Sequence, residues 1–222
     1  MVAKKRLRKK DIKQDRLVTM ALRTSTFVQA HFTQVITGVV VLVAAIGITL
    51  FMAQARRTKT TEATQQLAVA MDQFLLRDYE AASTTFLNIA DRHPGQDAGT
   101  TSLYFLGECY LSLYRYQDAV DAYDRYLDRS RDSHTFRVAA RIGRACAYEG
   151  LTQFETAAVQ MSELAETMDP KDTRYPDVLF RAGVFWEETG DVQKAVGFYD
   201  KVSEVATGPL KSRAAVKLAI LR

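Results

Sequence analysis

The stretch that decides the fold is Tyr116-Gln-Asp-Ala119-Val-Asp-Ala-Tyr123, because its pattern occurs three more times in the chain. Each copy has an aromatic or apolar residue, then alanine three positions later, then a bulky side chain four positions after the alanine. The other copies are Tyr79-Glu-Ala-Ala82-Ser-Thr-Thr-Phe86, Phe154-Glu-Thr-Ala157-Ala-Val-Gln-Met161 and Val192-Gln-Lys-Ala195-Val-Gly-Phe-Tyr199. The four alanines are 37, 38 and 38 residues apart. A segment that recurs at a fixed period of about 20 to 50 residues is typical of a solenoid.

The spacing within each copy predicts a helical hairpin. An alanine and a bulky residue four positions later share one helix face. About twelve residues before three of the alanines stands another small residue, at Gly107, Ala145 and Gly183. This arrangement predicts contacts of small against small residues between antiparallel helices. With only four prolines and eleven glycines in 222 residues, the composition also favours helices over strands and turns.

These segments resemble tetratricopeptide repeats, over about residues 63–209. The second repeat carries the family pattern at Leu103, Leu106-Gly107, Tyr110, Ala119 and Tyr123, and the fourth at Leu179, Ala182-Gly183, Trp186, Ala195 and Tyr199. The first and third repeats depart from it, because Gln66 and Arg141 stand where a large apolar residue is expected. The resemblance implies an all-α solenoid of about four repeats, closed by a solvating helix over Leu210–Arg222.

The resemblance also implies a groove, lined by the first helix of each repeat, that binds a peptide. The positions carried over are Leu67, Met71, Phe74, Tyr104, Glu108, Leu111, Ile142, Glu149, Phe180, Val184 and Glu187. An apolar floor with carboxylates suits a basic, partly hydrophobic segment. In the alternative interpretation, the apolar side chains pack against the next repeat and the glutamates are ordinary solvated charges.

The long uncharged apolar stretch at residues 32–55 predicts a transmembrane helix. The stretch reads FTQVITGVVVLVAAIGITLFMA from Phe32 to Ala53, and no charged residue occurs between Arg23 and Arg56. A hydrocarbon core of about 30 Å needs about 20 helical residues, which this segment supplies. The alternative is a signal peptide cleaved after Ala55, since Ala53-Gln54-Ala55 is a small-x-small sequence.

The charge is divided unevenly along the chain. Residues 1–31 carry nine basic and two acidic residues, a net charge of +7, whereas residues 56–222 carry 21 basic and 24 acidic residues, a net charge of −3. A basic tail beside an apolar span indicates contact with anionic lipid, through Lys13, Arg16 and Arg23, rather than with nucleic acid. We therefore expect residues 1–31 to form a cytoplasmic juxtamembrane segment and residues 56–222 to be a repeat domain outside the cytoplasm.

This layout resembles the ancillary subunit family of the bacterial SecYEG translocon. The resemblance implies a single-pass protein of the bacterial inner membrane with a periplasmic repeat domain. The predicted function is a membrane-anchored scaffold or adaptor that binds other envelope proteins, at a translocation channel. One alternative is a structural accessory subunit of a larger membrane complex. Another is an organelle import receptor whose repeats face the cytosol.

No motif of a catalytic site is present. The chain lacks a G-x-S-x-G element, a phosphate-binding glycine loop, an H-E-x-x-H pair and a dinucleotide fingerprint. Cys109 and Cys146 are 37 residues apart and the three histidines are scattered, so no metal-ligand spacing occurs. The cysteines are expected to be small buried side chains, with a disulfide as the alternative in an oxidising compartment. The sequence predicts no enzyme activity, no cofactor and no small-molecule substrate.

Overall fold

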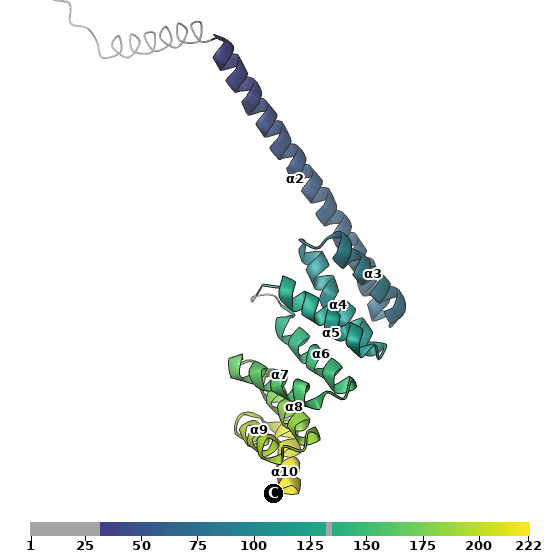
Figure 1. The fold of residues 1–222 in the computed structure, drawn as a ribbon, viewed down its shortest axis with the longest axis vertical. Coiled ribbons are helices and arrows are strands. Elements are labelled where there is room, and N and C mark those ends of the chain that lie inside the picture. The colour runs from purple at the N-terminus through teal and green to yellow at the C-terminus, as the bar shows by residue number, and fades with distance from the viewer. Residues whose placement is uncertain (1–31, 132–134) are drawn as a thin grey trace, which may run out of the picture. The chain divides into compact units, whose positions relative to one another are not determined.

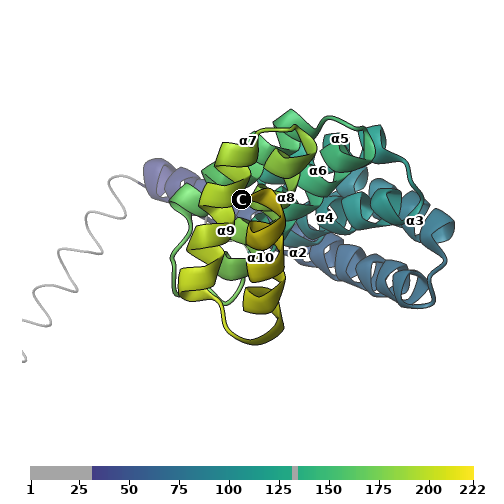
Figure 2. The ribbon, with the colours of Figure 1, turned by 90° about the horizontal axis from the view of Figure 1, so that it is seen from below.

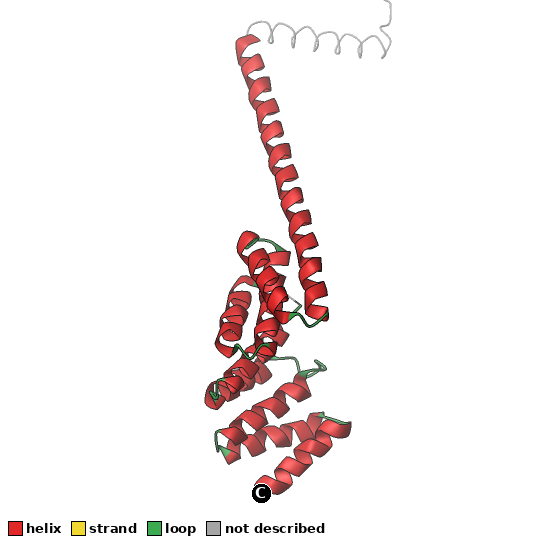
Figure 3. Ribbon diagram, turned by 90° about the vertical axis from the view of Figure 1, so that its right-hand side faces the viewer, coloured by secondary structure: helices red, strands yellow, loops and turns green. Residues whose placement is uncertain are grey.

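All regular structure in the described part of the chain is α-helical. The computed structural model describes residues 32–131 and 135–222, and no strand occurs among them (Figure 3). This confirms the all-α prediction. The predicted lipid-contacting residues Lys13, Arg16 and Arg23, and the rest of segment 1–31, lie outside the described residues.

The described helices follow one another in helix–turn–helix pairs (Figure 1). They are α2 (Phe32–Leu75), α3 (Tyr79–Arg92), α4 (Asp97–Ser112), α5 (Tyr116–Arg129), α6 (Arg137–Gly150), α7 (Phe154–Thr167), α8 (Tyr175–Glu188), α9 (Val192–Val205) and α10 (Gly208–Leu221). From α3 onward each helix packs against the next one, and α8 also contacts α10. The order is that of a hairpin solenoid of about four repeats with one additional C-terminal helix.

The chain divides into two compact units, Met1–Thr58 and Lys59–Arg222. Helix α2 crosses this boundary and also the boundary expected at residues 55 and 56. Among the helices that the structure describes, none is both long enough and apolar enough to span a membrane.

The last part of α2 is the first helix of the first repeat. Ala63 and Ala70 are buried, and Phe74 places its ring 5.6 Å from Tyr79 and 5.5 Å from Phe105, centroid to centroid. Leu67, Met71 and Phe74 are half-buried against the core of α3 and α4. Gln66 is also half-buried and donates a hydrogen bond to Glu62 within α2, which explains how the degenerate first repeat tolerates it.

The repeated alanines and bulky residues form the core, as the pattern predicts. The buried set is Ala82, Ala119, Ala157, Ala195, Phe86, Tyr123, Met161 and Tyr199. The expected contact of small against small residues needs a correction. A Cβ added at Gly107 would lie 2.6 Å from the ring of Tyr123, and one at Gly183 would lie 2.7 Å from the ring of Tyr199. The glycines therefore accommodate tyrosine rings rather than alanines.

A residue with positive φ stands in the turn of each hairpin. These residues are Arg77 at 62°, Tyr114 at 60°, Thr152 at 57° and Gly190 at 82°. Each lies five residues before the repeated alanine, so the turns have the same period as the core. Two of the second helices are capped by aspartate, since Asp78 accepts from the Ala81 amide and Asp191 from the Lys194 amide.

The core consists of two clusters of apolar side chains that meet at α6. The buried residues of α6 are small, namely Ala140, Gly143, Ala145 and Ala147. Its arginines make polar contacts instead: Arg141 donates to Thr167 Oγ1 at 3.2 Å and Arg144 to Gln160 Oε1 at 2.9 Å. Burial also lowers the pKa of Arg141, the residue that departs from the repeat pattern. Polar contacts thus replace apolar ones in the degenerate third repeat.

Candidate binding groove

Helices α8 and α10 present two matching rows of side chains. The rows are Asp177, Phe180, Arg181 and Val184 on α8, and Arg213, Val216, Lys217 and Ile220 on α10. In each row the positions are i, i+3, i+4 and i+7, so the four side chains share one helix face. Figure 2 shows α10 beside α8 and α9 at the C-terminal end of the chain.

These rows line two adjoining cavities, which together we call the C-terminal groove. The larger cavity, of about 500 Å³, lies between α8 and α10. The smaller, of about 220 Å³, is lined by side chains of α6, α8 and α10. Phe180, Val184 and Arg213 line both cavities, so the two form one continuous surface.

The floor of the groove is apolar. Phe180 is only 6% exposed, and its ring lies 5.5 Å from that of Tyr199. In contrast, Val216 is 59% exposed and Ile220 is 71% exposed. The expectation of a solvating C-terminal helix therefore needs a correction, because α10 exposes an apolar pair instead of a wholly polar face. This exposed apolar pair adjoins the larger cavity.

Two cations of α10 lie at the edge of this floor. The guanidinium carbon of Arg213 is 4.4 Å from the centroid of the Phe180 ring. Lys217 forms an ion pair with Glu187, in which Nζ is 2.8 Å from Oε1. The second carboxylate oxygen of Glu187 accepts a 2.7 Å hydrogen bond from the hydroxyl of Tyr199.

These contacts account for the pKa of Glu187. Burial by itself raises that pKa, but the hydrogen bonds from Lys217 and Tyr199 outweigh burial and hold it below its ordinary value. Burial and the neighbouring Glu187 carboxylate raise the pKa of the Tyr199 hydroxyl. Glu187, expected to face a ligand, is therefore an ionised carboxylate engaged inside the fold.

Two other residues expected in the groove are brought together. Glu149 of α6 is exposed and lines the smaller cavity with Phe180. Arg181 lies in the same cavity and donates to the Cys146 sulfur at 3.3 Å. Ile142 is half-buried and packs against the core cluster of α7, α8 and α9.

The remaining expected residues lie on α4, where side chains of the fold surround them. Tyr104 stacks on Phe136, with ring centroids 4.5 Å apart and ring planes 7° apart. Glu108 accepts a 2.6 Å hydrogen bond from the hydroxyl of Tyr123. Leu111 is half-buried against the core of α3–α5. In this repeat Tyr104 and Leu111 pack against neighbouring side chains of the fold, as in the alternative interpretation, whereas Glu108 is hydrogen-bonded and is not an ordinary solvated charge.

Sequence reasoning missed the contribution of α10. Its cations and apolar pair were assigned to a solvating cap, so half of the groove was not predicted. The signal was present: Gly208–Arg222 contains four basic residues and no acidic residue, and Val216 and Ile220 stand four apart. Leu210, Leu218 and Leu221 pack against the core, so apolar residues occupy both the packed and the open side of α10.

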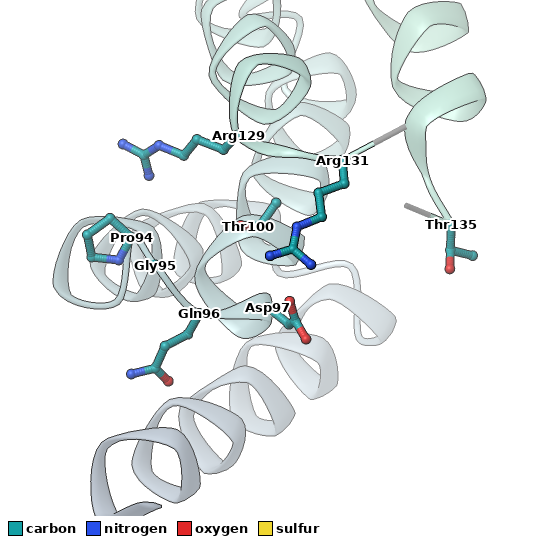
Figure 4. A pocket seen from close by; sticks show the side chains of 8 residues that line it. All are labelled: Pro94, Gly95, Gln96, Asp97, Thr100, Arg129, Arg131 and Thr135. Atoms are coloured by element: carbon teal, nitrogen blue, oxygen red, sulfur yellow. The ribbon is translucent and has the colours of Figure 1, made fainter. Parts of the chain in front are cut away.

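A third cavity, of about 540 Å³, lies at the start of α4 (Figure 4). Its lining is mostly polar: Pro94, Gly95, Gln96, Asp97, Thr100, Arg129, Arg131 and Thr135. Figure 4 shows the guanidinium of Arg131 pointing toward Asp97. Residues 132–134, which adjoin Arg131 and Thr135, lie outside the described part of the chain, so we assign this cavity no function. Within the described ranges, no group of three or more His, Cys, Asp or Glu side chains is placed to hold a metal ion.

Comparison with known proteins confirms the repeat fold. Residues 68–134 match the family described as tetratricopeptide repeat. No curated protein matches the chain in sequence. The solved structure of MamA is similar, with 16% identity and a TM-score of 0.60 over 72% of this chain and 80% of MamA. YrrB, described as a tetratricopeptide repeat protein with an unusual peptide-binding site, has 15% identity and a TM-score of 0.56 over 70% of this chain and 74% of YrrB. A tetratricopeptide repeat protein of Parabacteroides merdae has 18% identity and a TM-score of 0.61 over 72% of this chain and 60% of that protein. The chain thus has a tetratricopeptide-like helical solenoid.

Proposed function

We propose that this chain is a scaffold that captures a peptide segment of another protein, without covalent chemistry, in the C-terminal groove. The observation that carries the proposal is the exposed pair Val216 and Ile220 beside the floor formed by Phe180 and Val184. Two parallel rows of apolar side chains suit the ridge of an amphipathic helix or an extended segment. Tetratricopeptide folds are in general protein-interaction scaffolds, and the peptide-binding site named for YrrB supports the proposal by analogy of fold.

The experiment that tests this function is a comparison of two variants of the full-length chain. The double variant Val216→Asp/Ile220→Asp places two charges in the groove. Val205→Asp places one at another exposed valine, on α9, which lines neither cavity. Both proteins are affinity-purified from cells of the source organism after chemical cross-linking, and co-purified proteins are quantified by mass spectrometry.

We expect the groove variant to lose its principal partner by about tenfold or more, as for the loss of a central interface residue. The Val205→Asp protein should retain the partner. Circular dichroism of both proteins establishes that they are folded. Equal recovery by both variants would remove the groove as the binding surface. A partner recovered in fixed stoichiometry by both would favour a structural accessory subunit.

We also propose that residues 32–55 anchor the scaffold in the bacterial inner membrane. The absence of charge in the complete segment supports this, as do its exposed apolar side chains, among them Val41, Val43 and Leu50. Lys13, Arg16 and Arg23 would face anionic lipid on the cytoplasmic side.

In this arrangement residues 56–222 are periplasmic and the partners are envelope proteins. Confinement near the bilayer raises the effective concentration of the groove toward membrane partners. The layout of basic tail, apolar segment and repeat domain supports a place at a translocation channel of the SecYEG type.

Anchoring is tested with the double variant Leu42→Lys/Ile46→Lys. Two cations near the middle of a span cost about 5 to 7 kcal/mol on the insertion scale. We expect the wild-type chain to stay in membranes at alkaline pH and the variant to be released. Protease added outside spheroplasts should degrade the repeat domain of the wild type. Release of the wild type by alkali, or protection of its repeat domain, would contradict the anchor or its orientation.

A further inference from the structure

We infer that the occupant of the C-terminal groove is an acidic amphipathic segment of a partner protein, with its carboxylates against Arg213. This inference rests on the proposed function and specifies the chemistry of the partner. It begins from the charges of α10. The segment Gly208–Arg222 contains Lys211, Arg213, Lys217 and Arg222 and no acidic residue.

Two of these four cations are already neutralised within the fold. Lys217 is paired with Glu187, and Arg222 is paired with Asp200 through its Nη2 atom at 2.7 Å. Within residues 32–131 and 135–222, neither Lys211 nor Arg213 has a carboxylate oxygen within 4.0 Å. Positive charge is therefore in excess on this helix, and at Arg213 the excess lies in the groove.

The position of Arg213 suits recognition of a carboxylate. Its guanidinium lies over the Phe180 ring at 4.4 Å and is therefore held at the floor of the larger cavity. A guanidinium stacked on an aromatic face keeps its N–H donors at the edge of its plane, where they can form two parallel hydrogen bonds to a carboxylate. The lining of the larger cavity includes Arg213 and Lys217 but no carboxylate.

The same geometry disfavours a basic peptide, which the glutamates suggest in sequence. Of the three glutamates expected to attract cations, Glu108 is bonded to Tyr123 and Glu187 to Lys217 and Tyr199. Only Glu149 is exposed, and in the smaller cavity it and the exposed Asp177 are matched by the cations of Arg181 and Arg213, so that cavity has no excess of negative charge. The net attraction of the larger cavity is thus for negative charge.

Two other occupants are disfavoured on physical grounds. The basic segment 1–31 has a net charge of +7 and would be repelled by α10. A flat bilayer surface would contact Val216 and Ile220 and leave the cavity of about 500 Å³ between α8 and α10 unfilled. A ridge of side chains on a peptide can enter that cavity and contact Val184 as well as the exposed pair.

The test is a selection of random twelve-residue peptides displayed on phage, with the full-length chain in detergent micelles as the bait. Peptides that also bind the uncharged variant Val216→Ser/Ile220→Ser are discarded, so that those retained depend on the apolar side chains of the groove and are not selected by added charge. We expect the retained peptides to combine apolar residues with Asp or Glu and to have a negative mean charge. A selection on Arg213→Glu should retain peptides that carry Lys or Arg.

Affinity measurements on one retained acidic peptide complete the test. We expect Arg213→Glu to weaken binding by about tenfold or more, as for the loss of a close charge pair at an interface. Lys201→Glu makes the same change of charge on α9, outside both cavities, and should leave affinity within about twofold, because distant exposed charges are screened by salt.

Several outcomes overturn the inference. Retained peptides that are neutral or basic would do so, as would acidic peptides insensitive to Arg213→Glu. If the selection retained no peptide but Val216→Asp/Ile220→Asp lost the cellular partner, the inference of an acidic occupant would be wrong. The proposed binding function would still stand in that case. A photo-reactive residue at position 220 that labels lipid instead of protein in proteoliposomes would identify a lipid contact in place of a peptide site.

Discussion

Glu187 on α8 and Lys217 on α10 form an ion pair of 2.8 Å that joins the last hairpin to the C-terminal helix. The pair is partly buried, with side chains 23% and 35% exposed, and the Tyr199 hydroxyl binds the same carboxylate. Lys217 directly follows Val216 in the sequence, so the pair orients the helix that supplies half of the groove. A contact inside the fold thereby positions the surface that we propose for binding.

Replacing Glu187 by Gln should make stability less dependent on pH. The folded-state pKa of Glu187 lies below the ordinary value, so the unfolded chain binds the proton more tightly. The stabilisation is complete above the unfolded carboxyl pKa of about 4.3 and is lost as the pH falls through the folded-state pKa. At neutral pH we expect Glu187→Gln to lose about 1 kcal/mol of unfolding free energy, reduced by partial exposure.

Urea unfolding of both proteins at pH 7, 5, 4 and 3 measures this effect. The stability difference between wild type and Glu187→Gln should be largest at pH 7 and disappear at the lowest pH. A difference that stays constant with pH would show that the pair does not stabilise the fold through charge.

Gly107→Ala and Gly183→Ala should both destabilise the solenoid. The added methyl group would lie 2.6 Å from the Tyr123 ring or 2.7 Å from the Tyr199 ring, and both rings are buried. Overpacking of this kind costs about 1 to 3 kcal/mol. Gly197→Ala is the matched control, since Gly197 is helical, and a Cβ there meets nothing within 4 Å. It should gain up to about 1 kcal/mol, because alanine is the better helix former.

Thermal unfolding of the three glycine variants ranks them. The expected order of melting temperature places Gly197→Ala above the wild type, and the other two below it. An unchanged melting temperature of Gly107→Ala would contradict this prediction, because it would mean that the ring of Tyr123 is free to move away from the added methyl group.

Thr152→Gly should stabilise the chain, although it introduces glycine. Thr152 has φ of 57° in the turn between α6 and α7, a conformation that is strained for a β-branched residue. Removing the strain of a left-handed backbone conformation raises the unfolding free energy by about 1 to 2 kcal/mol, and the greater conformational entropy of glycine in the unfolded chain partly offsets this gain. In the equivalent turn, Gly190 has φ of 82°, so Gly190→Ala should cost a similar amount. In chemical denaturation we expect the unfolding free energy to rise in Thr152→Gly and to fall in Gly190→Ala. A change in the same direction for both variants would contradict the prediction.

Tyr104→Ala should act on stability, and Val216→Asp on binding. Tyr104 is half-buried, stacks on Phe136 and contacts Phe105, Tyr123 and Tyr126, so its truncation should cost about 2 kcal/mol, less than the loss of a fully buried aromatic. Val216 is exposed, and its replacement should leave the melting temperature within a few degrees of the wild type. Calorimetry of both variants checks this contrast. A stable Tyr104→Ala protein that has lost its partner would return Tyr104 to the binding surface.

The sequence by itself determined the hairpins and their period. An alanine and a bulky residue four positions apart define a buried helix face by local geometry, so Ala119 and Tyr123 reveal the repeat without any tertiary information. In the turns between the helices, glycine favours the positive φ found at Gly190, whereas Tyr114 and Thr152 adopt a positive φ that their residue types do not favour.

Only the tertiary structure decided which surface is open for binding. Glu187 and Lys217 are 30 residues apart, and their pairing depends on how α10 packs against α8, which no local pattern encodes. The same packing exposes Val216 and Ile220 while stacking of Phe136 covers Tyr104. Helix formation is local, whereas the occupation of a groove depends on side chains brought in from distant repeats. That is the physical reason why the solenoid and the α8 side of the proposed groove could be predicted and the α10 side could not.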